Sequence, residues 1–87
     1  MTHQLHNHNE WHNKTVWITG ANQGIGAETA NQFQQLGAKV IGFDLHFDSP
    51  NDAITQVTLD LSNEKAVIST CESLIEKHGS VDILVNI

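Results

Sequence analysis

The stretch that decides the fold of this chain reads Thr19-Gly20-Ala21-Asn22-Gln23-Gly24-Ile25-Gly26. An apolar strand pattern, Val16-Trp17-Ile18, precedes it, and an amphipathic helix pattern follows it to about Leu36, where Gly37 marks the end. A glycine-rich turn between a buried strand and a helix is typical of the place where a βαβ fold binds a nucleotide pyrophosphate. The stretch therefore predicts a nucleotide-binding α/β fold.

The three glycines of this turn have separate expected roles. Gly20 lets the chain leave the strand sharply, Gly24 has no Cβ that would block the phosphates, and Gly26 lets the helix pack tightly against the sheet. The unpaired N–H groups of the first helical turn, together with the helix dipole, would then bind the anion.

The composition limits both the size and the partners of the protein. The 87 residues are enough for one small domain, and a chain of this size buries only about 60% of its unfolded surface. Four Lys, no Arg and ten acidic residues give a formal charge of −6, which argues against nucleic acid and anionic membranes as partners. A single cysteine suits a reducing compartment, and no stretch resembles an export signal or a membrane span, so we expect a cytoplasmic protein.

Hydrophobic periodicity divides the chain into a leader and one domain. Residues 1–10 are polar and are expected to form a disordered leader, whereas residues 11–87 form the domain. The domain is predicted to contain strands at 15–19, 39–44, about 55–59 and 81–86, helices at 24–36 and about 63–78, and a loop at 45–54.

Each predicted helix carries an apolar stripe that should face the sheet. The stripes comprise Ile25, Thr29, Phe33 and Leu36 in the first helix, and Val67, Cys71, Leu74 and Ile75 in the second. Because Cys71 lies within its stripe, we expect a core thiol rather than a nucleophile.

The order of these elements predicts a parallel sheet. Right-handed crossovers place the strands in the order 3-2-1-4, the first half of a Rossmann-type doubly wound sheet and the start of its second half. The second crossover, at about ten residues, is too short for a full helix. The strand at 81–86 would remain a long apolar edge, so the architecture is expected to be truncated after the fourth strand.

Asp44 closes the second strand, eighteen positions after Gly26. This is close to the spacing of the acid that binds an adenosine ribose, and its carboxylate would accept hydrogen bonds from the ribose hydroxyls and repel a 2′-phosphate. Because neither Gln23 nor Leu45 offers a cation for that phosphate, we expect NAD rather than NADP. The alternative is an Asp that is merely solvated at the end of a strand.

The spacing Thr-Gly-x-x-x-Gly-x-Gly resembles that of the short-chain dehydrogenase/reductase family, and further matches extend over most of residues 11–86. Asp60-Leu61 stands where the family has an Asp that contacts the adenine ring. Val85-Asn86 stands where the family begins an Asn-Ala-Gly turn beneath the cofactor. Trp11 and Lys14 match the approach to the first strand, with Asn13 in a glycine position that Asn can tolerate.

This resemblance implies a set of cofactor-binding residues. They are Gly20, Asn22, Gln23, Gly24, Ile25, Gly26, Asp44, Leu45, Asp60, Leu61 and Asn86. Asp60 has an alternative role as the N-terminal anchor of the second helix, with Ser62 as a rival cap. Asn86 has an alternative role in satisfying backbone groups at the end of its strand.

Within the family, residues 16–21 and 37–47 look most like 2,3-dihydro-2,3-dihydroxybenzoate dehydrogenases of catecholate siderophore synthesis. Such enzymes oxidise a dihydrodiol with NAD to the aromatic product. The resemblance therefore implies an NAD-dependent oxidoreductase with a small-molecule dihydrodiol substrate and a homotetrameric parent. Another short-chain dehydrogenase, such as a 3-oxoacyl-carrier-protein reductase-like enzyme, is the alternative within the family.

The catalytic residues of the family have no counterpart in this chain. The resemblance implies a Tyr, a Lys that lowers the pKa of that Tyr, and a Ser, all located after the fourth strand. This chain contains no Tyr, and Ile87 stands where the family has Ala. We expect no turnover from these residues alone, and the alternative function is that of a non-catalytic nucleotide-binding remnant or truncated product.

The histidines do not predict a metal site. His3, His6, His8 and His12 lie in or beside a polar leader that cannot present four well-placed ligands, so no metal is expected. His78, at the end of the second helix, is expected to complement the helix dipole. His46 lies near the expected adenosine site, and the sequence leaves its role open.

Overall fold

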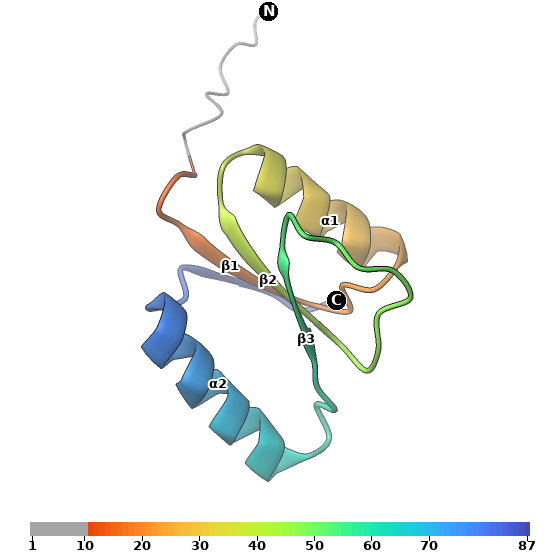
Figure 1. Cartoon of the computed structure of the whole chain (residues 1–87), viewed down its shortest axis with the longest axis vertical. Coiled ribbons are helices and arrows are strands. Elements are labelled where there is room, and N and C mark those ends of the chain that lie inside the picture. The colour runs from red at the N-terminus through yellow and green to blue at the C-terminus, as the bar shows by residue number, and fades with distance from the viewer. Residues whose placement is uncertain (1–10) are drawn as a thin grey trace, which may run out of the picture.

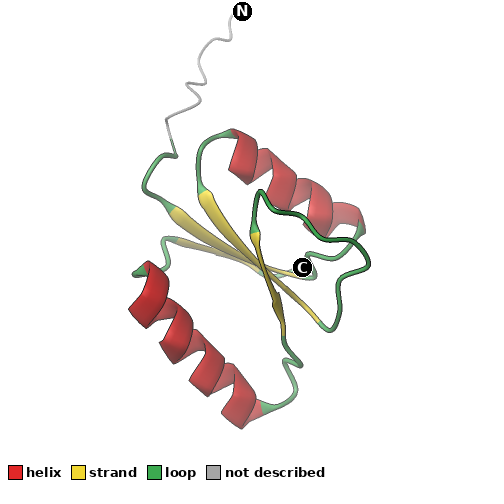
Figure 2. Cartoon of the chain, in the orientation of Figure 1, coloured by secondary structure: helices red, strands yellow, loops and turns green. Residues whose placement is uncertain are grey.

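The computed structural model describes residues 11–87, so the expectations for the leader and for its three histidines lie outside the described part. The elements along the chain are β1 (Thr15–Thr19), α1 (Gly24–Gln35), β2 (Lys39–Asp44), β3 (Thr55–Thr58), α2 (Glu64–His78) and β4 (Ile83–Val85) (Figures 1 and 2). The bounds of β1 and β2 are as predicted, and the other elements differ from prediction by a few residues at their ends.

The four strands form one parallel sheet in the order β3-β2-β1-β4, which confirms the predicted Rossmann-type topology. Ile18 of β1 lies opposite Gly42 of β2 on one side and Val85 of β4 on the other. Figure 1 shows α1 and α2 on opposite sides of this sheet. The carboxyl ends of all four parallel strands therefore meet at one edge, where such folds bind ligands.

Two apolar clusters, one on each face of the sheet, make up the core. Successive residues of β1 enter different clusters because side chains alternate between the two faces of a strand. Since both faces are covered, the strand is apolar throughout its middle. The cluster beneath α1 contains Val16, Ile18, Ala21, Ala30, Ala38 and Val40, and the cluster facing α2 contains Trp17, Ile41, Phe43 and Leu59.

The predicted stripe of α1 was wrong in its first half. Gly26 and Ala30 are the buried residues of this helix and Phe33 packs against the core, whereas Ile25 is 74% exposed. Small residues face the sheet because the helix lies so close to it and to the turn that a large side chain does not fit there.

The predicted stripe of α2 is largely confirmed. Val67, Cys71 and Leu74 pack against the second cluster, so Cys71 is the core-facing thiol that was expected. Ile75, however, is exposed, and no residue of α2 is fully buried. This helix therefore covers its face of the sheet less completely than α1 covers the other.

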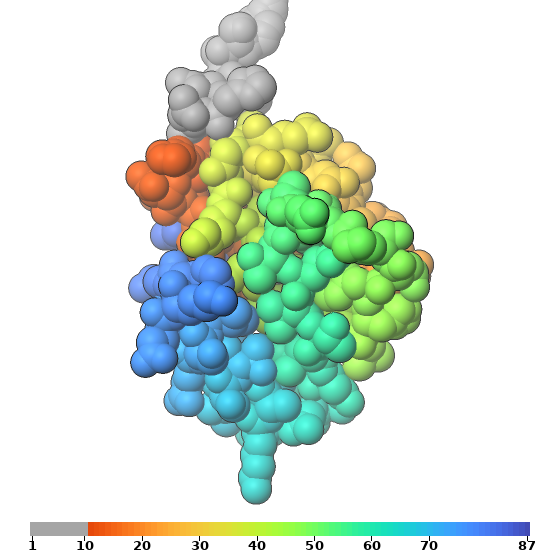
Figure 3. Space-filling view, in the orientation of Figure 1, coloured from red at the N-terminus to blue at the C-terminus, as the bar shows by residue number. Residues whose placement is uncertain are grey.

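Residues 45–54 cross from β2 to β3 without a helix, as their length predicted. Side-chain amides attach this segment to its neighbours: Asn51 Nδ2 donates to Asn31 Oδ1 of α1 at 3.5 Å, and Gln56 Nε2 donates to the carbonyl oxygen of Ser49 at 3.0 Å. In Figure 3 the segment, coloured yellow-green to green, lies against α1. Hydrogen bonds from polar side chains thus hold in place a crossover that has no helix.

The strand β4 is shorter than predicted. Three residues pair with β1, and Leu84 in the middle is 63% exposed. The strand begins after Asp82, whose carboxylate accepts a hydrogen bond from the Thr15 N–H at the start of β1 at 2.8 Å. The apolar edge is therefore real but short.

Two backbone details at the helix and strand entries are also informative. Asn13 has φ +73°, which confirms the left-handed conformation expected in the glycine position. Asn63 is the N-cap of α2, with its Oδ1 accepting from the Ala66 N–H at 3.1 Å. Neither Asp60 nor Ser62 caps the helix, because both lie before the cap in a turn of their own.

Candidate functional site

The glycine-rich turn has the backbone geometry that its sequence predicts. Gly20 has φ +69° and Gly24 has φ +62°, a region that side chains other than glycine rarely adopt. A Cβ on Gly26 would lie 2.6 Å from the carbonyl carbon of Gly20, so the helix packs directly against the turn. A Cβ on Gly24 would meet nothing within 4 Å, so open space borders the turn at that position.

The N-terminus of α1 is available to a ligand. Its N-cap residue, Gln23, has an extended backbone and makes no side-chain capping hydrogen bond. No acidic residue lies in the first turn either. The N–H groups of that turn therefore lack the side-chain partners that capping normally provides, and the helix dipole adds a positive potential there.

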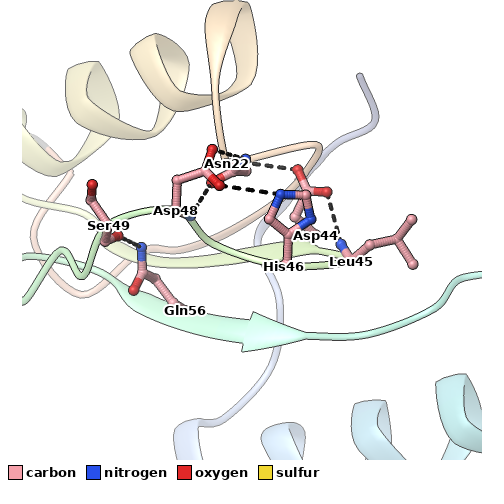
Figure 4. Close-up of polar contacts among 7 residues, drawn as sticks. All are labelled: Asn22, Asp44, Leu45, His46, Asp48, Ser49 and Gln56. Carbon is pink, nitrogen blue, oxygen red and sulfur yellow. Dashed lines mark hydrogen bonds and ion pairs between the residues drawn. The ribbon is translucent and has the colours of Figure 1, made fainter.

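Asp44, at the carboxyl end of β2, is oriented by two backbone N–H groups. Its Oδ2 accepts a hydrogen bond from Asn22 N at 3.0 Å, and its Oδ1 accepts one from Leu45 N at 2.8 Å (Figure 4). The carboxylate is thus attached to the glycine-rich turn across 22 residues of sequence. Each oxygen keeps a further lone pair with which it can accept from a ligand.

Asn22 also binds a second carboxylate, which the sequence had not indicated. Asn22 Nδ2 donates to Asp48 Oδ2 at 3.0 Å, and the Asp48 N–H donates back to Asn22 Oδ1 at 2.8 Å. His46 Nε2 lies 3.3 Å from Asp48 Oδ1, and both of these side chains are exposed. The only sequence signal was the loop predicted at residues 45–54, which does not specify a partner.

A cavity of about 300 Å³ adjoins these groups. Five of the predicted residues line it, namely Gly20, Asp44, Leu45, Asp60 and Leu61, together with Thr19, Leu59, Ser62 and Ile87. The predicted residues Asn22, Gln23, Gly24, Ile25, Gly26 and Asn86 do not line it. The cavity therefore brings Asp44, the first glycine of the turn and the residues after β3 together in one place.

Asp60, after β3, is held in a local turn. Its Oδ1 accepts from the Ser62 hydroxyl at 2.7 Å and from the Ser62 N–H at 2.9 Å. The hydroxyl hydrogen bond, followed by the backbone one, lowers the pKa of this carboxyl below its ordinary value of 3.8. Asp60 is therefore an anion at neutral pH, at the rim of the cavity.

Asn86 bonds to a side chain rather than to backbone groups. Thr19 Oγ1 donates to Asn86 Oδ1 at 2.7 Å and accepts from the Ile87 N–H at 3.0 Å. These bonds connect the carboxyl ends of β1 and β4 next to Gly20. In the described residues, the bond of Asn86 Oδ1 is thus to the Thr19 side chain and not to a strand-end backbone group.

The remaining titratable candidates lie away from this site. His78 Nδ1 is 3.3 Å from Lys39 Nζ, and partial burial, followed by the charges of Lys39 and Lys77, lowers the pKa of His78 below 6.5. His78 lies with Lys77 in the last turn of α2, the position expected for a partner of the helix dipole, and its lowered pKa makes its cationic form less populated there. Within residues 11–87 no three His, Cys, Asp or Glu side chains form a metal-binding group.

In the same range of residues, neither helix has the length and apolar character that crossing a membrane requires.

Comparison with protein families gives a match to the short chain dehydrogenase family over residues 14–87. Among curated proteins, the chain is 38% identical over 73 residues to 2,3-dihydro-2,3-dihydroxybenzoate dehydrogenase of Escherichia coli (strain K12), an alignment that covers 84% of this chain and 29% of the relative. The chain thus spans about 30% of the length of the relatives it matches.

Solved structures share the same fold. The ligand-free aldohexose dehydrogenase of Thermoplasma acidophilum superimposes with a TM-score of 0.83 at 29% identity, over 91% of this chain and 31% of that one. A short chain dehydrogenase from Leptospira borgpetersenii with bound NAD+ gives a TM-score of 0.80 at 27% identity, over 91% and 32% of the two chains.

Proposed function

The chain belongs to the short chain dehydrogenase family, and on that basis we propose that residues 11–87 form the NAD-binding part of an oxidoreductase. The family implies a nicotinamide cofactor and a small-molecule substrate. We propose that the cofactor is NAD and not NADP. The proposal also covers the substrate and the residues that contact the cofactor. The bound NAD+ of the similar Leptospira structure supports the choice of cofactor.

The observation that carries the proposal is the position of the Asp44 carboxylate. It is attached to Asn22 of the glycine-rich turn and borders the cavity, so one group adjoins both the expected pyrophosphate site and the expected ribose site. Its free lone pairs would accept hydrogen bonds from both ribose hydroxyls. A 2′-phosphate would instead meet a like charge at that point, which favours NAD.

The rest of the cavity suits the adenine. Leu45 and Leu61 line the cavity and are both exposed, so their apolar side chains could cover the two faces of a purine ring. Asp60, ionised at the rim, would accept from an adenine N–H group. The uncapped N–H groups of the first turn of α1 would bind the pyrophosphate.

The substrate that we propose is a dihydrodiol that is oxidised to 2,3-dihydroxybenzoate, as in catecholate siderophore synthesis. The 38% identity to the Escherichia coli dehydrogenase supports it. When bound, NAD would accept the hydride from this substrate. These residues hold the cofactor but include no Tyr for the proton transfer, which favours a nucleotide-binding rather than a catalytic role for this part. A cytoplasmic homotetramer completes the proposal.

The proposal is tested by titrating the chain with NADH and following quenching of Trp11 and Trp17 fluorescence. We expect saturable binding that Asp44→Ala weakens by roughly tenfold or more, because a charged group that accepts hydrogen bonds contributes about 1.5–3 kcal/mol. Asp52→Ala is the matched control. It also removes one negative charge, and among the described residues Asp52 makes no hydrogen bond to Asn22. A chain that melts cooperatively but binds no NADH would contradict the proposal.

A further inference from the structure

We propose that Asp48 is a second cofactor-selecting residue, whose carboxylate, held at the glycine-rich turn by Asn22, excludes a 2′-phosphate beside Asp44. This inference rests on the proposed function, namely NAD binding at the turn and at Asp44. It assigns a specific role to a residue in the crossover segment 45–54.

Asn22 is the residue that brings the two carboxylates together. Its backbone N–H donates to Asp44 Oδ2 at 3.0 Å, and its side-chain Nδ2 donates to Asp48 Oδ2 at 3.0 Å. Two acids four positions apart in the sequence are therefore bound to the same residue of the turn. Figure 4 shows Asp44 and Asp48 on either side of Asn22, with His46 between them.

The bond between Asn22 and Asp48 is reciprocal, which sets the position of the second charge. Because the Asp48 N–H also donates to Asn22 Oδ1 at 2.8 Å, both the backbone and the side chain of Asp48 are attached to the same amide. The segment after β2 consequently folds back onto the turn, and the Asp48 carboxylate, although exposed, stays bonded to Asn22. The charge of Asp48 stays on the side of the turn that the ribose acid occupies.

Two negative charges at this point would affect the binding of NAD and of NADP differently. The ribose 2′-hydroxyl of NAD is neutral, whereas a 2′-phosphate carries up to about two negative charges and would be repelled by both carboxylates. In the described residues, His46 is the only basic side chain within ion-pair distance of Asp48, and its imidazole offsets the charge only when protonated. No Lys occurs within residues 19–26 or 44–48.

The test compares Asp48→Asn with Asp52→Asn in the full 87-residue chain. Asp48→Asn is nearly isosteric and keeps an oxygen that can accept from Asn22 Nδ2, so it removes the charge and leaves the hydrogen bond. Asp52→Asn causes the same change in net charge within the same segment. Dissociation constants for NADH and NADPH are measured by tryptophan fluorescence at about 20 mM and about 200 mM salt, on either side of the range where screening becomes strong.

We expect Asp48→Asn to lower the ratio of the NADPH to the NADH dissociation constant by roughly two- to fivefold at low salt, as expected for like charges some ångströms apart in water. Asp52→Asn should leave the ratio unchanged. Asp48→Lys should lower the ratio further, and added salt should reduce each difference because the interaction is electrostatic.

Three other results would overturn the inference, and they differ from one another. An equal shift in Asp48→Asn and Asp52→Asn would assign the effect to net charge. An unchanged ratio in Asp48→Asn, with a lowered ratio in Asp44→Asn, would leave the proposed function intact and make Asp44 the sole selecting residue. Binding of neither nucleotide by the unaltered chain would overturn the proposed function, and this inference with it.

Discussion

Gly26, in the first turn of α1, packs directly against the carbonyl group of Gly20, the first glycine of the turn. A Cβ at position 26 would lie 2.6 Å from the carbonyl carbon of Gly20, a separation that real Cβ contacts do not show. Since both partners are backbone, neither a rotamer change nor a side-chain shift can relieve the overlap. The glycine at 26 is therefore required by the path of the chain itself.

The first prediction concerns Gly26→Ala. We expect it to destabilise the chain by about 3 kcal/mol or more, the upper end of what overpacking costs and more than in Gly24→Ala, because the helix must move away from the turn. Gly24→Ala is the matched control: its Cβ meets nothing within 4 Å, and its cost is limited to the left-handed conformation, about 1–2 kcal/mol. Urea unfolding followed by circular dichroism measures both.

The same two variants separate packing from ligand approach. If Gly24 provides room for the phosphates, Gly24→Ala should weaken NADH binding more than its loss of stability explains. Equal stability losses in the two variants would show that the contact between positions 26 and 20 is not tight in solution.

The second prediction concerns the start of α2. Asn63→Ala should reduce the free energy of unfolding by about 1 kcal/mol, because the Ala66 N–H loses its capping acceptor. Ser62→Ala should have a smaller effect, since the Ser62 hydroxyl bonds to Asp60 and not to the helix. Chemical denaturation of the two variants side by side measures the difference, and a larger loss in Ser62→Ala would refute the assignment of the cap.

The third prediction is a pH dependence that arises from His78. Its pKa in the folded chain is lowered by partial burial and by Lys39 and Lys77, so the unfolded chain takes up the proton first as the pH falls below about 6.5. The stabilising contribution is therefore complete above that pH and is lost as the pH falls toward the folded-state pKa.

Two variants check this pH dependence. His78→Gln removes the titrating group, so the stability of the unaltered chain relative to this variant should be greater at about pH 7.5 than at about pH 5. Lys39→Gln removes one of the three causes and should weaken the dependence without abolishing it. A difference between the unaltered chain and His78→Gln that does not change with pH would contradict the prediction.

Much of the fold could be read from local sequence patterns. The strands at 15–19 and 39–44 were predicted at their observed bounds because strands buried on both faces are apolar along their middle and end at turn residues. The absence of a crossover helix followed from the ten residues between two strands. The strand order followed from the handedness of the connections, which depends on backbone chirality and not on side chains.

The sequence was less informative where close packing or long-range polar contacts decide the outcome. Ile25 fits the apolar period of α1, yet it is exposed, because the helix packs closely with the small residues Gly26 and Ala30 on its buried face. The cap of α2 is Asn63 and neither of the two expected residues, because Asp60 and Ser62 bond to each other.

What the sequence by itself determined is the βαβ order, the glycine-rich turn and the acid at the end of β2, because residues near one another in the chain specify each of them. Only the tertiary structure decided that Asn22 holds both Asp44 and Asp48. The bond to Asp44 spans 22 positions of sequence and the bond to Asp48 spans 26, and no local pattern encodes either of them. They form because the parallel sheet brings the carboxyl ends of β1 and β2 together, and the polar groups that meet there then bond to one another.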